Sequence, residues 1–126
     1  MMEQERANEL LADLGSLIVG SQEVAGEAWS SLAVVAIRDG GWSVSGLLYV
    51  EGDDDATPFL PDEEFDDIIR DFYDATLVEG KPGWLSCLIQ INRDGMQVRI
   101  TFEYENADRW AMTPGNRAEL IAALRG

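Results

Sequence analysis

Carboxylates are the side chains of this sequence that could act chemically as a group, and they gather in one segment. Residues 51–74 hold eleven of them against one cation, Arg70, so this segment carries ten of the fifteen net negative charges of the chain. They are Glu51, Asp53, Asp54, Asp55, Asp62, Glu63, Glu64, Asp66, Asp67, Asp71 and Asp74. Such a density could bind a divalent cation or attract a positively charged macromolecule, and its self-repulsion opposes compact folding.

The other residue types argue against catalysis and against a metal centre. The chain has no His, which removes the commonest general base and the usual zinc ligand. The run at residues 53–55 lacks the ordered ligand spacing of a calcium loop. Cys87 is in phase with the apolar Leu85 and Ile89, which predicts a core residue rather than a nucleophile. We therefore expect no enzyme, no bound metal and no cofactor.

Length and charge narrow the class of protein further. A chain of 126 residues predicts a single domain, residues 1–126. No apolar run reaches the ~20 residues of a membrane span, the N-terminus does not resemble a signal peptide, and one cysteine cannot form an internal disulfide. The isoelectric point near 4.1 disfavours contact with nucleic acids and with anionic membranes. These features predict a cytoplasmic protein that binds neither.

Apolar spacing predicts helices and strands in alternation. Residues 3–19 have the spacing of an amphipathic helix. Two β-rich runs on either side of Asp39-Gly40 predict a hairpin, and the first run, apolar on both faces, is expected to be covered on both sides or to meet another chain. Residues 53–61 are expected to form an acidic loop, followed by a helix that Asp62 caps.

The C-terminal half repeats this pattern. Residues 84–92 and 96–104 predict a second hairpin, and Thr113-Pro114 is typical of a helix start. The expected order is α-ββ-α-ββ-α. We therefore predict an α+β fold in which two hairpins form an antiparallel four-stranded sheet with the helices packed on it.

The predicted acidic helix turns its charges away from the core. Phe65, Ile69 and Phe72 fall on one stripe, and the opposite side carries mostly carboxylates. Two interpretations are open: a solubilising surface, or one docking surface formed with the adjoining acidic loop and suited to a basic protein. The aromatic residues are also ambiguous, since Trp110, just before the last helix, could anchor an interface or wedge that helix against the sheet.

Three stretches carry a resemblance to a known family. They are residues 82–88 (Pro-Gly-Trp-Leu-Ser-Cys-Leu), 93–95 (Arg-Asp-Gly) and 100–105 (Ile-Thr-Phe-Glu-Tyr-Glu). This pattern resembles the YezG-like immunity proteins of bacterial toxin systems. The resemblance implies a cytoplasmic protein that binds and neutralises the toxic C-terminal domain, often a nuclease, of a contact-delivered toxin.

Candidate partner-binding residues follow from the charge and from this resemblance. A basic toxin domain is expected to contact Asp53, Asp54, Asp55, Glu63, Glu64, Asp67, Asp71 and Asp74. A second candidate patch consists of Glu103, Glu105 and Asp108, with Trp110 beside it. The alternative is a non-enzymatic module that binds a small ligand or forms a homodimer, in which the acidic surface only keeps the protein in solution.

Overall fold

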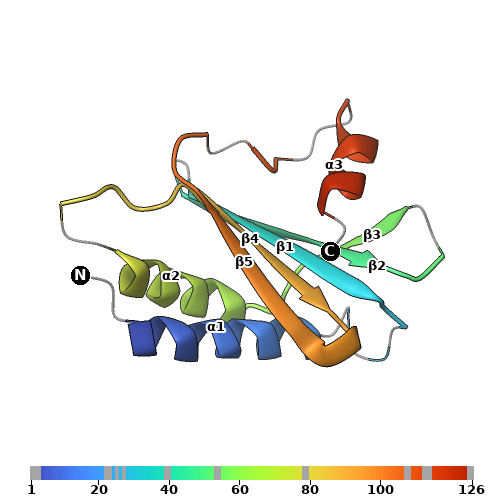
Figure 1. Cartoon of the computed structure of the whole chain (residues 1–126), viewed down its shortest axis with the longest axis horizontal. Coiled ribbons are helices and arrows are strands. Elements are labelled where there is room, and N and C mark those ends of the chain that lie inside the picture. The colour runs from blue at the N-terminus through green and yellow to red at the C-terminus, as the bar shows by residue number, and fades with distance from the viewer. Residues whose placement is uncertain are drawn as a thin grey trace.

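The computed structural model describes residues 4–21, 24, 26, 28–38, 41–52, 55–77, 80–106, 109–111 and 115–124. One antiparallel sheet of five strands, in the order β3-β2-β1-β4-β5, forms the middle of the molecule. Helices α1 and α2 lie side by side on one face of the sheet, and α3 lies on the other (Figure 1). The elements are α1 (Gln4–Val19), β1 (Ser31–Arg38), β2 (Trp42–Tyr49), β3 (Ala56–Phe59), α2 (Glu64–Thr76), β4 (Ser86–Asn92), the short 3-10 turn η1 (Asp94–Met96), β5 (Gln97–Glu103) and α3 (Arg117–Leu124).

The central strand β1 separates two hydrophobic cores. Its even-numbered residues, such as Val34, pack with the buried stripes of α1 and α2. Its odd-numbered residues, such as Val35, pack with Trp110 and the buried side of α3. The expectation that this strand is covered on both sides is therefore confirmed, and it is covered by helices of the same chain.

Both predicted hairpins form, with β1 paired to β2 and β4 paired to β5. The predicted sheet, however, was wrong. The sheet of the structure has five strands rather than the predicted four, because residues 56–59 of the expected acidic loop form an additional strand, β3, beside β2. Gly46 in β2 makes room for this strand, since a Cβ atom built there would lie 2.6 Å from the Phe59 ring.

Pro58 occupies a position in β3 where a strand accepts proline. The N–H of Arg93 donates to the carbonyl of Ser30, so even-numbered residues of β1 direct their backbone groups to β4, and odd-numbered ones direct theirs to β2. Ala33 faces Leu47, and Leu47 in turn faces Pro58. The backbone groups of Leu47 therefore point towards β1, and the N–H that proline lacks is not needed.

One helix start differs from expectation. Helix α2 begins at Glu64, and Glu63 occupies its N-cap position without a side-chain capping hydrogen bond, whereas Asp62 was the predicted cap. The apolar stripe of α2 follows the prediction, because Phe65, Ile69 and Phe72 are buried. Helix α3 begins at Arg117, and the predicted start at residues 113–114 lies outside the described residues. In the described part of the chain, no helix has the length and apolar character that crossing a membrane requires.

Candidate protein-binding surface

The outward side of α2 is an exposed row of carboxylates. Buried Phe65, Ile69 and Phe72 fix the orientation of the helix, so the residues between them point to solvent. The exposed carboxylates are Glu63, Glu64, Asp66, Asp67, Asp71 and Asp74. Among the described residues, ion pairs join Arg6 to Glu9, Arg109 to Glu103 and Arg117 to Asp55, and none of these involves α2.

Helix α1 widens this acidic surface, which sequence reasoning did not foresee. It packs beside α2, and its exposed side carries Glu5, Glu9 and Asp13. Arg6 lies 3.8 Å from Glu9 as an exposed pair. The sequence pattern that could have predicted this acidic side is the four-residue spacing of the three carboxylates, opposite the buried Leu10 and Leu14. We call the exposed carboxylates of the two helices, together with Glu63, the helical acidic face.

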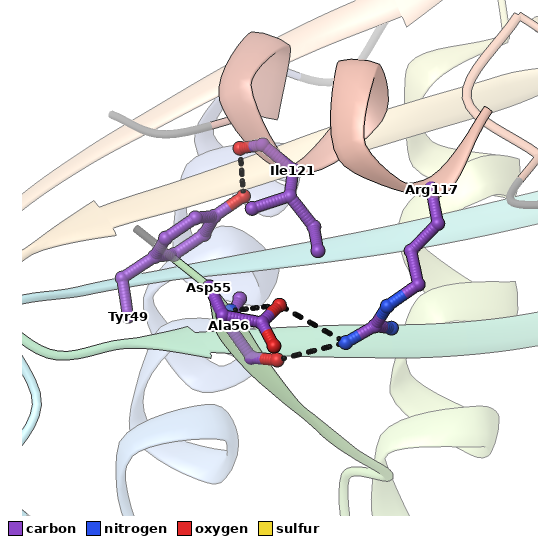
Figure 2. Close-up of polar contacts among 5 residues, drawn as sticks. All are labelled: Tyr49, Asp55, Ala56, Arg117 and Ile121. Atoms are coloured by element: carbon purple, nitrogen blue, oxygen red, sulfur yellow. Dashed lines mark hydrogen bonds and ion pairs between the residues drawn. The ribbon is translucent and has the colours of Figure 1, made fainter. Parts of the chain in front are cut away.

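Asp55 does not belong to this face. It lies at the start of β3, and its Oδ1 accepts hydrogen bonds from the backbone N–H of Ala56 at 2.8 Å and from Arg117 Nη2 at 3.1 Å (Figure 2). Arg117 belongs to α3, on the opposite side of the sheet from α2, and also donates to the carbonyl of Ala56 at 3.4 Å. The loop and the helix were expected to form one acidic surface, and for Asp55 this prediction was wrong. Asp53, Asp54 and Asp108 lie outside the described residues.

Glu103 stabilises the turn that follows β5. Its Oε2 accepts the backbone N–H groups of Glu105 at 3.0 Å and Asn106 at 3.2 Å, and its Oε1 accepts Arg109 Nη1 at 3.2 Å. These interactions hold the pKa of Glu103 below its usual value, the hydrogen bond from Glu105 being the largest cause and the one from Asn106 the next. Glu103 is thus already paired within the chain, while Glu105 is exposed.

Trp110 packs inside the protein rather than on its surface. It is 7% exposed and belongs to the core between the sheet and α3, with the Arg109 guanidinium 4.9 Å from its ring. It therefore wedges α3 against the sheet, the second of the two interpretations open from the sequence. Trp29 and Trp84 are also buried.

An aromatic cluster adjoins the helical acidic face at the C-terminal end of α2. Tyr73 extends from α2, with its ring 5.7 Å from Trp42 and 5.0 Å from Trp84. The Arg38 guanidinium lies 4.5 Å from the centre of the Tyr73 ring. The indole N–H of Trp84 donates to Thr76 Oγ1 at 2.8 Å. The cluster combines residues that are distant in sequence, so no local sequence pattern predicted it.

No metal centre is evident among the described residues, and their apolar hollows are of two sizes. No group of three or more His, Cys, Asp or Glu side chains there could hold a metal ion. An open hollow between α1 and the sheet, lined in part by Gly15, Ile91 and Val98, measures about 380 Å³. The apolar hollow between α3 and the sheet, lined in part by Val35, Leu47 and Leu120, measures about 80 Å³. Small-molecule pockets usually measure at least ~300 Å³. This hollow is therefore a packing defect rather than a pocket for a ligand of ordinary size.

Comparison with known proteins adds no family to this description. No family model matches the chain, and no curated protein matches it significantly. The function is therefore argued from the surface itself.

Proposed function

We propose that this protein binds a basic protein domain through the helical acidic face and neutralises it, as an immunity protein neutralises a toxin. The observation that carries the proposal is the outer side of α2. It exposes Glu64, Asp67, Asp71 and Asp74, and no cation among the described residues forms an ion pair with any of them.

The spacing of these charges leaves repulsion that a cationic partner would relieve. Glu63 and Asp67, and Asp67 and Asp71, are like-charge pairs four residues apart, and each such pair costs about 0.2–0.5 kcal/mol in a helix. Arg70 is the only basic residue in α2. A surface evolved for solubility alone gains the same net charge from carboxylates placed farther apart.

Electrostatics also indicate the kind of partner. A protein that binds phosphates presents a basic cleft, and a carboxylate row is complementary to it. Charge steering raises the association rate, which suits an inhibitor that must act before its target does. Nuclease domains have such clefts, which agrees with the resemblance to YezG-like immunity proteins.

The aromatic cluster supplies the apolar part of this surface. Trp42 and Tyr73 are only partly buried, and Tyr104 is 52% exposed. Tyrosine and tryptophan contribute strongly at protein interfaces because they bury a large area and keep a polar group. We expect the partner to cover Tyr73 together with the C-terminal turn of α2.

The test is a charge reversal with a matched control. The first step is to find whether a gene beside this one encodes a protein with a basic C-terminal domain. That domain is the probe, and its affinity is measured by calorimetry. Asp67→Lys with Asp71→Lys should raise the dissociation constant by about 10- to 100-fold. The affinity of the unmodified protein should fall as salt rises, because exposed charges are screened.

The control pair is Glu51→Lys with Glu119→Lys, which changes the net charge equally. Both residues are exposed, and Glu119 lies on α3, across the sheet from the helical acidic face. Glu9 is unsuitable as a control because α1 borders α2. Equal weakening by the two pairs would show that the attraction is nonspecific, and absence of any complex would refute the proposal for this probe.

A further inference from the structure

Strand β5 forms an open edge of the sheet. It pairs with β4 on one side, and in the described part of the chain no strand lies on its other side (Figure 1). Val98 on this strand is 41% exposed, and Tyr104 just after it is 52% exposed. Unpaired edges of this length bind further strands unless charge, proline or a bulge prevents it.

The hydrogen bonds of β4 determine which residues of β5 face this open edge. The N–H of Arg93 donates to the carbonyl of Ser30, and the N–H of Arg38 donates to the carbonyl of Leu85. Both bonds belong to the same antiparallel β1–β4 register. Because backbone groups alternate in direction along a strand, the odd-numbered residues of β4 face β1 and the even-numbered ones face β5.

The same alternation continues into β5. Leu88 faces Thr101, so Thr101 and the other odd-numbered residues of β5 direct their N–H and C=O groups to β4. The N–H and C=O groups of Val98, Ile100 and Phe102 consequently point to the open edge. These groups are available to another strand without any change in the fold.

The side chains of β5 are complementary to a second copy of the same strand. If two β5 strands pair antiparallel about a two-fold axis at Thr101, Arg99 lies opposite Glu103 of the other copy. In the same register Ile100 lies opposite Phe102, and the exposed Val98 lies opposite the exposed Tyr104. Opposite charges and apolar pairs at facing positions both stabilise antiparallel strands.

We propose that two copies of this protein pair through their β5 strands in this register and form one continuous ten-stranded sheet. Arg99 and Glu103 then form two symmetric ion pairs. Glu103 already accepts hydrogen bonds from Arg109 and two backbone N–H groups, but a carboxylate has about four acceptor positions, so it can also accept Arg99.

Net charge makes this pairing dependent on salt. Each copy carries a net charge of minus fifteen, and the two-fold axis is perpendicular to the sheet, so both helical acidic faces lie on the same side of the dimer. Salt screens this long-range repulsion more than it screens charges in contact. Dimerisation should therefore strengthen as salt rises, whereas binding of a basic partner should weaken.

The first test measures mass in solution. Sedimentation equilibrium of the full chain at about 0.5 M NaCl should give twice the monomer mass of 13.9 kDa. Arg99→Glu should raise the dimer dissociation constant at least about tenfold, since it places two carboxylates at each end of the pair. Arg70→Glu changes the net charge equally on exposed α2 and should leave the dimer intact. A monomer at every concentration, or equal effects of the two substitutions, would overturn the proposal.

The second test fixes the register and keeps the fold unchanged. Thr101→Cys places two thiols on the two-fold axis, at facing positions whose Cα separation suits a disulfide. The natural Cys87 is buried and cannot compete. Oxidation should cross-link this variant faster than Thr57→Cys, which places a thiol on the opposite edge strand, β3. Equal rates for the two variants would exclude this register.

Discussion

At the scale of single residues, burial changes the chemistry of Cys87 in a way that stability can report. The side chain is fully buried between β4 and the helices, as its phase with neighbouring apolar residues predicted. Burial raises the pKa of the Cys87 thiol from 9.0 to about 12, and a backbone hydrogen bond from Ala36 offsets only part of this. The thiol therefore stays protonated, and unreactive, in the folded protein at physiological pH.

This shift predicts a loss of stability in alkali. Below pH 9 both states hold the proton and the site contributes no pH dependence, whereas between about pH 9 and 12 only the folded state holds it. The free energy of unfolding should then fall by up to about 1.4 kcal/mol per pH unit from this site alone. Urea unfolding of the natural protein and of Cys87→Ala measures it, because the variant should lack this slope. Parallel curves for the two proteins above pH 9 would contradict the prediction.

At the scale of elements, side-chain hydrogen bonds at both ends of α3 hold this helix to the sheet. Tyr49 Oη donates to the carbonyl of Ile121 at 2.7 Å, as Figure 2 shows, and Gln90 Nε2 donates to the carbonyl of Leu124 at 3.0 Å. The last carbonyls of a helix have no partner within the helix, so these bonds satisfy groups that would otherwise be buried unpaired. At the start of α3, the Arg117 side chain links the helix to β3 by donating to Asp55 and to the carbonyl of Ala56.

Removing one of these bonds should loosen α3 and leave the rest of the fold in place. Tyr49→Phe keeps the buried ring and deletes the donor, which should cost about 1–2 kcal/mol of unfolding free energy. Hydrogen exchange should quicken in α3 and remain unchanged in α1. Tyr104→Phe removes a hydroxyl from an exposed side chain and serves as the control, with an expected effect below about 0.5 kcal/mol. A uniform rise in exchange over all helices would argue against a local role.

The elements that could be predicted from sequence are those in which one residue pattern decides the outcome. The stripe of Phe65, Ile69 and Phe72 and the strand pairing within the two hairpins are of this kind. Strand β3 could not be predicted, because Pro58 is acceptable only at a position whose hydrogen bonds go elsewhere, and that depends on the whole sheet. The exposed charges of α2 could be predicted from sequence. The carboxylates that α1 adds to this face, and the pairing of Asp55 with Arg117 away from it, depend on how distant elements pack and could not be predicted.

At the scale of the whole molecule, the excess of negative charge acts against the compact state. The chain carries a net charge of minus fifteen, and the helical acidic face concentrates much of it on one side. Screening should therefore stabilise the fold even where no specific ion binds. By the same reasoning, a cationic partner and added salt both reduce this repulsion, so either one can stabilise the folded state.

Thermal unfolding tests this effect. Raising NaCl from about 0.02 M to about 0.5 M should increase the melting temperature by several degrees, equivalent to about 1 kcal/mol. The less negative Asp67→Lys with Asp71→Lys variant should gain less from salt. A melting temperature that is independent of salt in both proteins would show that the charges of the helical acidic face do not strain the fold. The scan is made at low protein concentration, so that self-association does not contribute.

The position of β1 has a consequence for synthesis of the chain. This strand pairs with β2, which follows it directly, and with β4, which the ribosome releases only much later. Until then a nascent chain exposes one unpaired edge of its most apolar strand, along with the face that α3, the last helix to emerge, later covers. A polypeptide that stops before β4 should therefore aggregate or recruit a chaperone. The chain should fold without a chaperone only when its second half has emerged.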